Sequence, residues 1–180
     1  MKFKPLNLAG AFIIDLEKND DGRGFFARFY CEKEFSNVGL NTNWCQINNS
    51  VTAERGTLRG LHFQKAPNAE VKLVRCLNGC IWDVIVDIRN ESPSFGKWYA
   101  YELSALNRSM MYVPEGFAHG FISMTENVEI LYMVSVPYAP ASEETLVWDD
   151  PSVAINWPIH PRILSEKDRN GLSLSQITKH

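Results

Sequence analysis

Short stretches of β-forming residues follow one another along this chain, and turn-forming residues separate them. Val, Ile, Thr, Tyr, Phe and Trp are common in the stretches, whereas Gly, Pro, Asn and Asp are common between them. Examples of the predicted strands are residues 24–30, 46–52, 72–77, 80–89, 97–104, 110–113, 120–124 and 128–136. Only residues 32–38 and the tail after Ser165 have a helical pattern. Many short strands at this spacing predict an all-β sandwich, jelly roll or small barrel.

Residues 80–89 alternate most clearly between apolar and charged side chains. In an extended chain the two kinds fall on opposite faces, with Trp82, Val84, Val86 and Ile88 on one face and Asp83, Asp87 and Arg89 on the other. Turn-forming residues stand on both sides of this stretch. The pattern therefore predicts a half-buried strand.

With 180 residues, the chain is long enough for one domain with a substantial core. No linker, repeat or low-complexity segment divides it, so we expect a single domain over residues 1–180. The net charge of −3 gives no reason to expect a nucleic-acid partner, because phosphate binding requires a surplus of basic residues.

The sequence also gives an expectation about location. No stretch approaches the roughly 20 apolar residues of a membrane span, and the N-terminus lacks the apolar core of a signal peptide. The four cysteines are too few for a disulfide framework in a chain of this length. We therefore expect reduced cysteines and a cytoplasmic protein that has no membrane partner.

Two segments place a histidine beside glycines within stretches that otherwise have the character of strands. They are Arg59-Gly-Leu-His-Phe-Gln64 and Pro114-Glu-Gly-Phe-Ala-His119. Histidine has the unperturbed pKa nearest neutrality, so it is a common general base and a common metal ligand. Two such strands facing each other would line the mouth of a barrel with titratable groups, which either hold a metal or move protons.

These segments resemble the two motifs of the cupin jelly rolls. A metal-binding cupin usually supplies His-x-His and then Glu from the first motif, and a final His from the second. In this sequence Gln64 replaces the second histidine, and Lys72 lies in the region that should offer the Glu. An ammonium group there puts positive charge where a divalent cation would sit. The sequence thus favours an anion-binding pocket without metal, and a metal-dependent cupin is the alternative.

Cationic side chains that could surround such an anion come from several segments: Arg23, Arg59, Lys72, His62 and His119. Each arginine alone would equally suit a solvated surface position. Arg23, Arg55 and Arg59 each precede a glycine, where a backbone can approach a ligand closely. These glycines favour the binding role.

Beyond the histidine motifs, the sequence closely resembles the dTDP-4-dehydrorhamnose 3,5-epimerase family of nucleotide-sugar epimerases. The matching segments keep the family's order over nearly the whole chain: Asp21-Gly-Arg-Gly-Phe-Phe26, Gln46-Ile-Asn-Asn-Ser50, Leu58-Arg-Gly-Leu-His-Phe-Gln64, Lys72-Leu-Val-Arg75, Gly79-Cys-Ile-Trp-Asp-Val84, Val86-Asp-Ile-Arg89, Ser92-Pro-Ser-Phe-Gly-Lys-Trp98, Val113-Pro-Glu-Gly-Phe-Ala-His-Gly-Phe121, Trp148-Asp-Asp-Pro151, Ile155-Asn-Trp-Pro158 and Leu164-Ser-Glu-Lys-Asp168. The resemblance implies a cupin-type double-stranded β-helix, or jelly roll, with short peripheral helices. It also implies a homodimer, a nucleoside-diphosphate sugar as substrate and no cofactor.

The activity implied by the resemblance is that of an isomerase on a nucleoside-diphosphate 4-keto-6-deoxyhexose, mainly the conversion of dTDP-4-dehydro-6-deoxyglucose to dTDP-4-dehydrorhamnose. The C4 keto group makes the protons at C3 and C5 acidic, because each carbanion is an enolate. A base, an acid on the opposite face and a cation near the enolate oxygen suffice for epimerisation. The resemblance makes His62 the base and Asp168 the partner of its second ring nitrogen. Tyr132 would return the proton, and Lys72 would stabilise the enolate oxygen.

The resemblance also implies residues that bind the substrate. Arg59 and His119 would contact the sugar or its diphosphate, and Gln46 and Asn48 would supply neutral hydrogen bonds. The remaining expected contacts, several of them to the nucleotide, are Arg23, Phe26, Arg28, Tyr138, Glu143 and Lys167.

Two positions depart from the family pattern. The family usually has Glu in place of Arg28, near the nucleobase, where a carboxylate can accept from the N3–H of thymine or uracil. A guanidinium only donates, and cytosine offers acceptors at N3 and O2, so a CDP-sugar is an alternative substrate. Met133 stands where the family commonly has Lys after Tyr132. An epimerase of C3 or C5 alone is therefore the first alternative function, and a sugar-nucleotide-binding module without catalysis is another.

Overall fold

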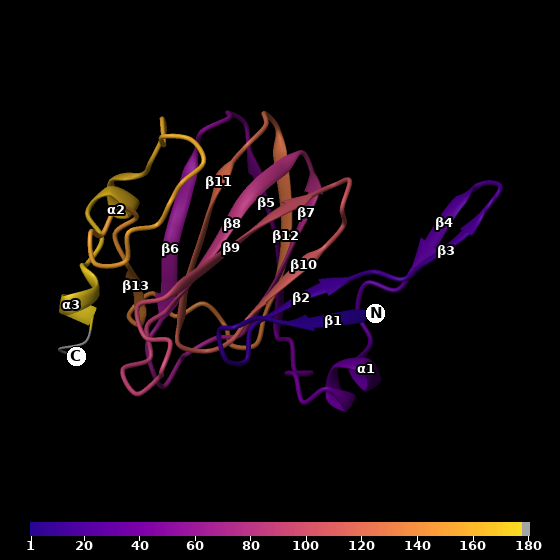
Figure 1. Ribbon diagram of the computed structural model, residues 1–180, viewed down its shortest axis with the longest axis horizontal. Helices are drawn as coiled ribbons and strands as arrows, with labels where there is room; N and C mark the ends of the chain where they lie inside the picture. Colours follow the sequence, from indigo (N-terminus) through magenta and orange to yellow (C-terminus); the bar gives the residue numbers. More distant parts are fainter. Residues whose placement is uncertain (178–180) are drawn as a thin grey trace.

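Two antiparallel sheets face one another in the computed structural model, which describes residues 1–177 (Figure 1). The six-stranded sheet has the order β1 (Lys2–Pro5), β2 (Phe12–Asp15), β10 (Met110–Val113), β7 (Lys72–Asn78), β12 (Val128–Val134) and β5 (Gln46–Thr52). The five-stranded sheet has the order β13 (Glu143–Thr145), β6 (Leu58–Gln64), β11 (Phe117–Ser123), β8 (Cys80–Asp87) and β9 (Trp98–Ser104). Neighbours in these sheets are often distant in sequence, as in a jelly roll.

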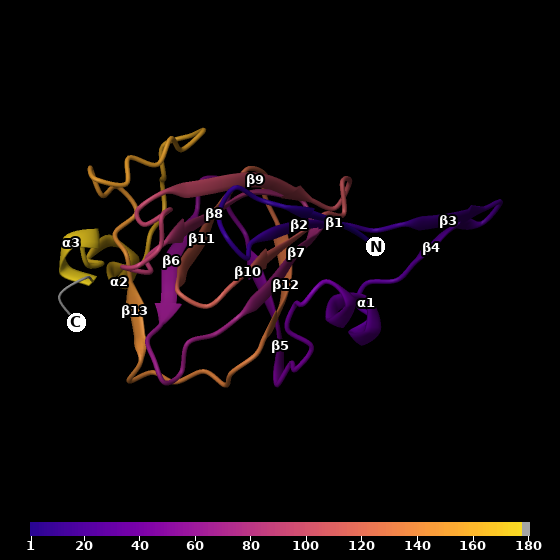
Figure 2. The same cartoon turned by 60° about the horizontal axis from the view of Figure 1, so that its bottom comes forward.

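The peripheral elements are a hairpin and three short helices. The hairpin of β3 (Lys18–Asp21) and β4 (Gly24–Ala27) projects away from both sheets, as Figures 1 and 2 show from two directions. Helix α1 (Glu32–Asn37) follows the hairpin, while α2 (Glu166–Arg169) and α3 (Leu174–Ile177) lie beside the five-stranded sheet. The predicted all-β fold with short peripheral helices is confirmed.

Apolar side chains fill three layers. Ile13 of the six-stranded sheet and Ile85 of the five-stranded sheet belong to the cluster between the sheets. The outer face of the five-stranded sheet packs Val84 against the C-terminal segment, including Leu174. Phe35 of α1, fully buried, belongs to the cluster that covers the outer face of the six-stranded sheet. Both faces of each sheet are thus partly removed from water.

Strand β8 differs from the half-buried strand that its alternation predicts. Asp83 and Asp87 are both 0% exposed, and Val84 and Val86 on the other face are equally buried. The carboxylates lie on the inner face of the sheet, where they form buried pairs with histidine and arginine partners. The half-buried prediction is wrong because alternation reports side-chain chemistry, whereas burial depends on what covers each face.

Other differences concern the ends of elements. Strand β4 ends at Ala27, before the predicted 30, and β11 begins at Phe117, before the predicted 120. The sequence reading missed β1, β2, β3 and β13, which have three or four residues each and are too short to show a period. The helix expected at residues 32–38 is confirmed as α1. None of the helices in residues 1–177 has the length and apolar character needed to cross a membrane.

Candidate active site

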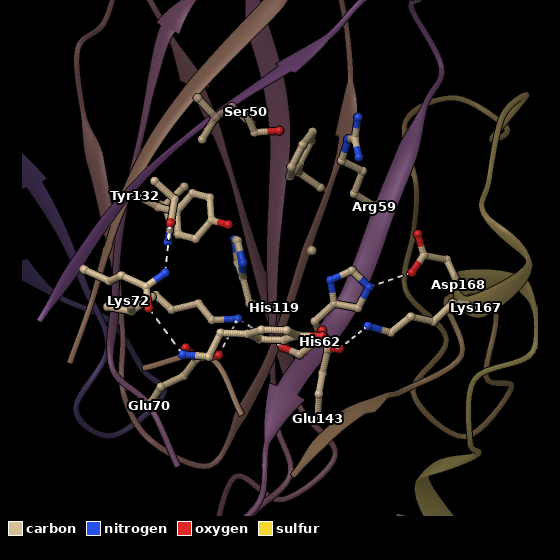
Figure 3. A pocket seen from close by; sticks show the side chains of 18 of the residues that line it. Ser50, Arg59, His62, Glu70, Lys72, His119, Tyr132, Glu143, Lys167 and Asp168 are labelled. Carbon is tan, nitrogen blue, oxygen red and sulfur yellow. Dashed lines mark hydrogen bonds and ion pairs between the residues drawn. The ribbon is translucent and has the colours of Figure 1, made fainter. Parts of the chain in front are cut away.

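A pocket of about 530 Å³ opens between the two sheets. Strands β5, β7 and β12 form one wall, β6, β11 and β13 form the other, and α2 adds residues beside β6 (Figure 3). The pocket brings together most of the predicted site residues: Gln46, Asn48, Arg59, His62, Lys72, His119, Tyr132, Tyr138, Glu143, Lys167 and Asp168. It lies where the two histidine motifs meet.

The two histidines are direct cross-strand partners, because His62 on β6 pairs with His119 on β11. Glycines permit the close approach of these strands. A Cβ added at Gly60, whose φ is +126°, would lie 2.5 Å from the Cα of Gly120. A Cβ at Gly120 would lie 2.6 Å from the carbonyl oxygen of Arg59. Gly60 thus serves strand packing, not the close approach of a ligand suggested by its neighbour Arg59.

His62 and Asp168 form a hydrogen-bonded pair, with 2.6 Å between Nε2 and Oδ1. Asp168 is 4% exposed, and Ser165 caps its helix by accepting from the backbone N–H of Asp168. Burial raises the pKa of Asp168, but His62, together with hydrogen bonds from Ser165 and Gly60, holds that pKa below its ordinary value. An ionised Asp168 accepts from Nε2–H and thereby leaves Nδ1 of His62 as the proton acceptor.

Tyr132 and Lys72 lie on the opposite wall of the pocket from His62 (Figure 3). Burial raises the pKa of Tyr132 and the charge of Glu70 raises it further, while Arg59 acts in the opposite direction. The phenol therefore remains a proton donor at neutral pH. The ammonium of Lys72 lies 3.1 Å from Glu70 Oε1 and donates to the carbonyl oxygen of His62 at 3.4 Å.

A second histidine–carboxylate pair lies deeper in the five-stranded sheet. Asp83 Oδ1 on β8 is 2.8 Å from His119 Nε2, and Asp83 is fully buried. Its other oxygen, Oδ2, is buried without a hydrogen-bond partner in the described part of the chain. The sequence places Asp83 on a charged face of its strand but does not reveal that β8 adjoins β11. The pair fixes the orientation of His119 at the pocket wall.

Neutral polar groups and one guanidinium line the wall near β5. Gln46, Asn48 and Ser50 follow one another at every second residue, so they share the face of β5 that lines the pocket. Arg59 Nε donates to Thr52 Oγ1 at 3.0 Å, which ties the guanidinium to the end of the same strand. Sequence reasoning missed Ser50, although the period of two from Gln46 and Asn48 predicts it. The amide and hydroxyl groups of this wall, together with the Arg59 guanidinium, can donate hydrogen bonds to the oxygens of a phosphate group.

Three predicted residues form a chain of contacts elsewhere in the pocket. The Tyr138 hydroxyl donates to Glu143 Oε2 at 2.8 Å, and the ammonium of Lys167 lies 2.5 Å from the same oxygen. Burial raises the pKa of Glu143, but these contacts to Lys167 and Tyr138 hold it below its ordinary value. Tyr138 is 58% exposed. An aromatic ring this accessible can pack on a bound ligand without displacing core residues.

Charge is divided unevenly within the pocket. Lys72 pairs with Glu70, and Lys167 pairs with Glu143, so each of these ammonium groups is next to a carboxylate. Arg59 instead contacts the neutral oxygens of its neighbours on β5. Figure 3 shows Arg59 at one end of the pocket and the two glutamates at the other. The Arg59 end is therefore the more favourable place for an anion.

Three predicted residues are absent from this pocket. Arg23 and Phe26 lie on the projecting hairpin, where the Arg23 side chain is 90% exposed and Phe26 is 69% exposed. Arg23 pairs with Asp21 at 2.7 Å. Arg28 follows the hairpin and pairs with Glu34 of α1 at 2.9 Å. The sequence carries no signal that this segment leaves the body of the molecule.

The donor groups near the motifs do not fit a metal ion. Gln64 uses its amide on the backbone, because Nε2 donates to the carbonyl oxygen of Asn68 at 3.0 Å and Oε1 accepts from Ala139 N–H at 2.5 Å. The ammonium of Lys72 lines the same pocket and pairs with the carboxylate of Glu70, which is thereby already engaged by a cation. Among residues 1–177, no three His, Cys, Asp or Glu side chains are grouped so that they could hold a metal.

The chain is similar to known proteins over nearly its whole length. The family model described as dTDP-4-dehydrorhamnose 3,5-epimerase matches residues 5–176. The dTDP-4-dehydrorhamnose 3,5-epimerase of Sinorhizobium fredii is 43% identical over 178 residues, which cover 98% of this chain and 91% of that protein. The crystal structure of the enzyme of the same name from Elizabethkingia anophelis superposes with a TM-score of 0.94 at 42% identity, covering 98% of this chain and 97% of that one.

A third similar protein is ChmJ, a 3'-monoepimerase from Streptomyces bikiniensis whose crystal structure contains dTDP-quinovose. It superposes with a TM-score of 0.90 at 32% identity, covering 98% of this chain and 89% of that one. The predicted jelly roll and the family resemblance are both confirmed. By the family model and by identity over nearly its whole length, this chain belongs to the dTDP-4-dehydrorhamnose 3,5-epimerase family.

Proposed function

We propose that this protein epimerises C3 and C5 of a dTDP-linked 4-keto-6-deoxyhexose, converting dTDP-4-dehydro-6-deoxyglucose to dTDP-4-dehydrorhamnose. The observation that carries the proposal is the opposition of the His62–Asp168 pair to Tyr132 and Lys72 across one pocket (Figure 3). A base on one face of a sugar ring and an acid on the other are what inversion of a carbon next to a ketone requires.

In the proposed reaction, Nδ1 of His62 removes the proton from C5 or C3. The electron pair of the broken C–H bond forms a C=C bond, and the C=O electrons move to O4 to give an enolate. Lys72 stabilises that oxygen, and Asp168 stabilises the imidazolium. Tyr132 then donates its proton to the opposite face as the ketone re-forms. Exchange with water reprotonates the phenolate and deprotonates His62, so the enzyme returns to its starting state.

Substrate contacts follow from the division of charge in the pocket. Arg59 and His119 would hold the diphosphate or the sugar, while Gln46 and Asn48 would add neutral hydrogen bonds. The chain Tyr138, Glu143 and Lys167 would contact the substrate from the other end. The Glu143 carboxylate makes that end more suitable for a neutral sugar than for a second phosphate, because carboxylates repel anions.

The direct test is incubation of the enzyme with dTDP-4-dehydro-6-deoxyglucose in deuterium oxide, followed by NMR. Incorporation of deuterium at both C3 and C5, with inversion at both, is the expected result. Substrate protons that persist at both carbons would reject the proposal. A parallel comparison with UDP-, CDP- and GDP-linked sugars would identify the nucleotide.

A single-centre epimerase is the second candidate, favoured by the similarity to the 3'-monoepimerase ChmJ. The same experiment separates the two functions, since deuterium at one carbon alone would assign a single centre. Met133, which stands beside Tyr132 where the family commonly has Lys, is the residue in this sequence that favours the alternative.

The choice of dTDP over CDP rests on the surroundings of Arg28. The Arg28 guanidinium pairs with Glu34 beside the hairpin. It would have to leave this ion pair before it could donate hydrogen bonds to a cytosine base. Glu34 also contacts the amino group of Met1 at 2.6 Å, which holds its carboxylate in place. The ion pair supports a thymine nucleotide, with Arg28 turned away from the base.

We further infer that the protein is a homodimer in which each hairpin supplies Arg23 and Phe26 to the partner's pocket. The hairpin projects away from its own pocket, and a side chain as apolar as Phe26 is 69% exposed at its surface. The edge strand β5 adds exposed Ile47 and Val51, which a second copy would cover. Such a dimer would complete the nucleotide site.

Two broader expectations accompany the proposal. We infer that the chain acts as one domain, since both sheets draw strands from the N-terminal and C-terminal halves. We also infer a cytoplasmic location, supported by four free cysteines. A single cooperative unfolding transition and cell fractionation are the respective measurements.

A further inference from the structure

Glu70 is an acidic residue inside the pocket to which the proposed mechanism assigns no role. It precedes Lys72 by two residues, so the two side chains extend on the same side of the backbone as it enters β7. The carboxylate of Glu70 lies 3.1 Å from the ammonium of Lys72, and both side chains are nearly buried, at 12% and 11% exposed. Figure 3 shows the pair on the wall that carries Tyr132.

The backbone beside Glu70 is anchored to the strand of Tyr132. Val71 N–H donates to Ser135 Oγ at 2.8 Å, and Ser135 N–H donates to the Val71 carbonyl oxygen at 3.1 Å. Ser135 directly follows β12, and Val71 is 8% exposed. These reciprocal bonds hold the backbone next to Glu70 beside the end of β12.

The contacts of Lys72 indicate that the Glu70 carboxylate restricts the orientation of its ammonium group. A lysine side chain is flexible and loses rotamer entropy when it is held in one orientation. Glu70 accepts from the ammonium on one side, while the carbonyl oxygen of His62 accepts on another. An ammonium has three N–H donors, so a third is available to the pocket. Charge stabilisation of an enolate is efficient only when its donor is oriented before the charge develops.

Resting on the proposed function, we propose that Glu70 is a positioning residue, which orients the ammonium of Lys72 toward the enolate oxygen. The charge of Glu70 acts on Tyr132 in the direction that raises its pKa, after burial and against the effect of Arg59. The other charged or titratable groups that line the pocket with Tyr132 come from the remaining elements: His62 on β6, His119 on β11, Glu143 on β13, Tyr138 in the loop before it, and Lys167 and Asp168 on α2.

Two substitutions separate the positioning of Lys72 from the effect of charge. Glu70→Ala removes the acceptor, and we expect kcat to fall roughly tenfold to a hundredfold with little change in KM, because a misplaced group costs about that much. Glu70→Gln keeps an amide oxygen that accepts from Lys72, so kcat should recover to within severalfold of wild type. The isosteric Gln variant also guards against a folding defect in the Ala variant.

The pH dependence of kcat gives the second readout. Loss of the negative charge in Glu70→Gln removes an effect that raises the pKa of Tyr132, so the phenol should lose its proton at lower pH and the alkaline limb of the kcat profile should move to lower pH. Glu126→Gln, an exposed acid in the turn between β11 and β12, is the matched control and should leave both kcat and the limb unchanged.

The proposal is overturned if Glu70→Ala retains wild-type kcat, or if Ala and Gln lose activity equally with no movement of the alkaline limb. The second result would indicate a merely structural role for Glu70. Wild-type enzyme assayed on the same substrate keeps the two proposals apart: no wild-type turnover rejects the epimerase function, whereas normal turnover with unaffected variants rejects only the role of Glu70.

Discussion

The proposed role of His62 as the base depends on Asp168. The short contact between them holds the ring in one tautomer and offsets the positive charge that the ring acquires on taking a proton. Asp168 owes its own ionisation to His62, Ser165 and the Gly60 backbone, which outweigh the effect of burial on its pKa. The two residues therefore act together, and substitution of either one should lower the rate of proton transfer.

Replacement of His62 by Ala should reduce proton exchange at C3 and C5 by at least about a hundredfold, because a positioned base typically contributes that much or more. Binding of dTDP, measured by calorimetry, should change little. Asp168→Asn should also lower the rate, because an amide can present the wrong partner to the ring. A His62→Ala enzyme within tenfold of wild type at saturating substrate would remove His62 from the role of base.

Substitution of Tyr132 by Phe keeps the ring in β12 and deletes only the hydroxyl. Stability should therefore change little, while inversion should be strongly reduced. Because His62 still removes protons, the variant should incorporate deuterium into the substrate with little inverted product. NMR in deuterium oxide measures both outcomes together. Normal inversion by a folded variant would leave Tyr132 as a packed residue of its strand.

Strand β8 ends in a hydrogen-bond network around Asp87, which the alternation of apolar and charged residues in the sequence does not predict. Asp87 accepts from the guanidinium of Arg89 and from the hydroxyls of Ser92 and Ser94. Burial raises the pKa of Asp87, but these hydrogen bonds lower it to about 2 overall. The turn that joins β8 to β9 is thus held by one buried carboxylate.

Because the folded-state pKa of Asp87 is depressed, its contribution to stability is present above the ordinary carboxyl range and is lost as the pH falls toward about 2. Asp87→Asn should reduce the free energy of unfolding by about 2 kcal/mol at neutral pH, and by less near pH 3. Urea unfolding at the two pH values measures the difference. Asp149→Asn, at an exposed site, should cost little at either pH. An equal loss from Asp87→Asn at both pH values would contradict this account.

The arrangement of the whole molecule determines which predicted residues share a site. The two sheets bring β5, β7 and β12 opposite β6, β11 and β13, so segments far apart in the sequence line one pocket. The hairpin with Arg23 and Phe26 points elsewhere (Figures 1 and 2). Whether it completes a partner's pocket can be tested with mixed dimers.

Arg23→Ala alters only the hairpin, and His62→Ala alters only the pocket, so a dimer of either variant alone should have low turnover. In a mixed dimer, the intact pocket of the Arg23→Ala subunit would receive the intact hairpin of the His62→Ala subunit. Equal amounts unfolded and refolded together should recover about a quarter of wild-type activity, since half of random dimers are mixed and each has one complete site. Activity no greater than that of the two variants refolded separately would place the hairpin outside the partner's site.

The sequence by itself determined the fold class and most of the residues that line the pocket. Alternation and turn residues are local properties, so the strands were identified from them, and the family motifs identified His62, Asp168 and Tyr132. Only the tertiary structure decided that Asp83 and Glu70 join the site. Burial and contact depend on which strands become neighbours and on what covers each face, and a period of two within one strand carries no information about either.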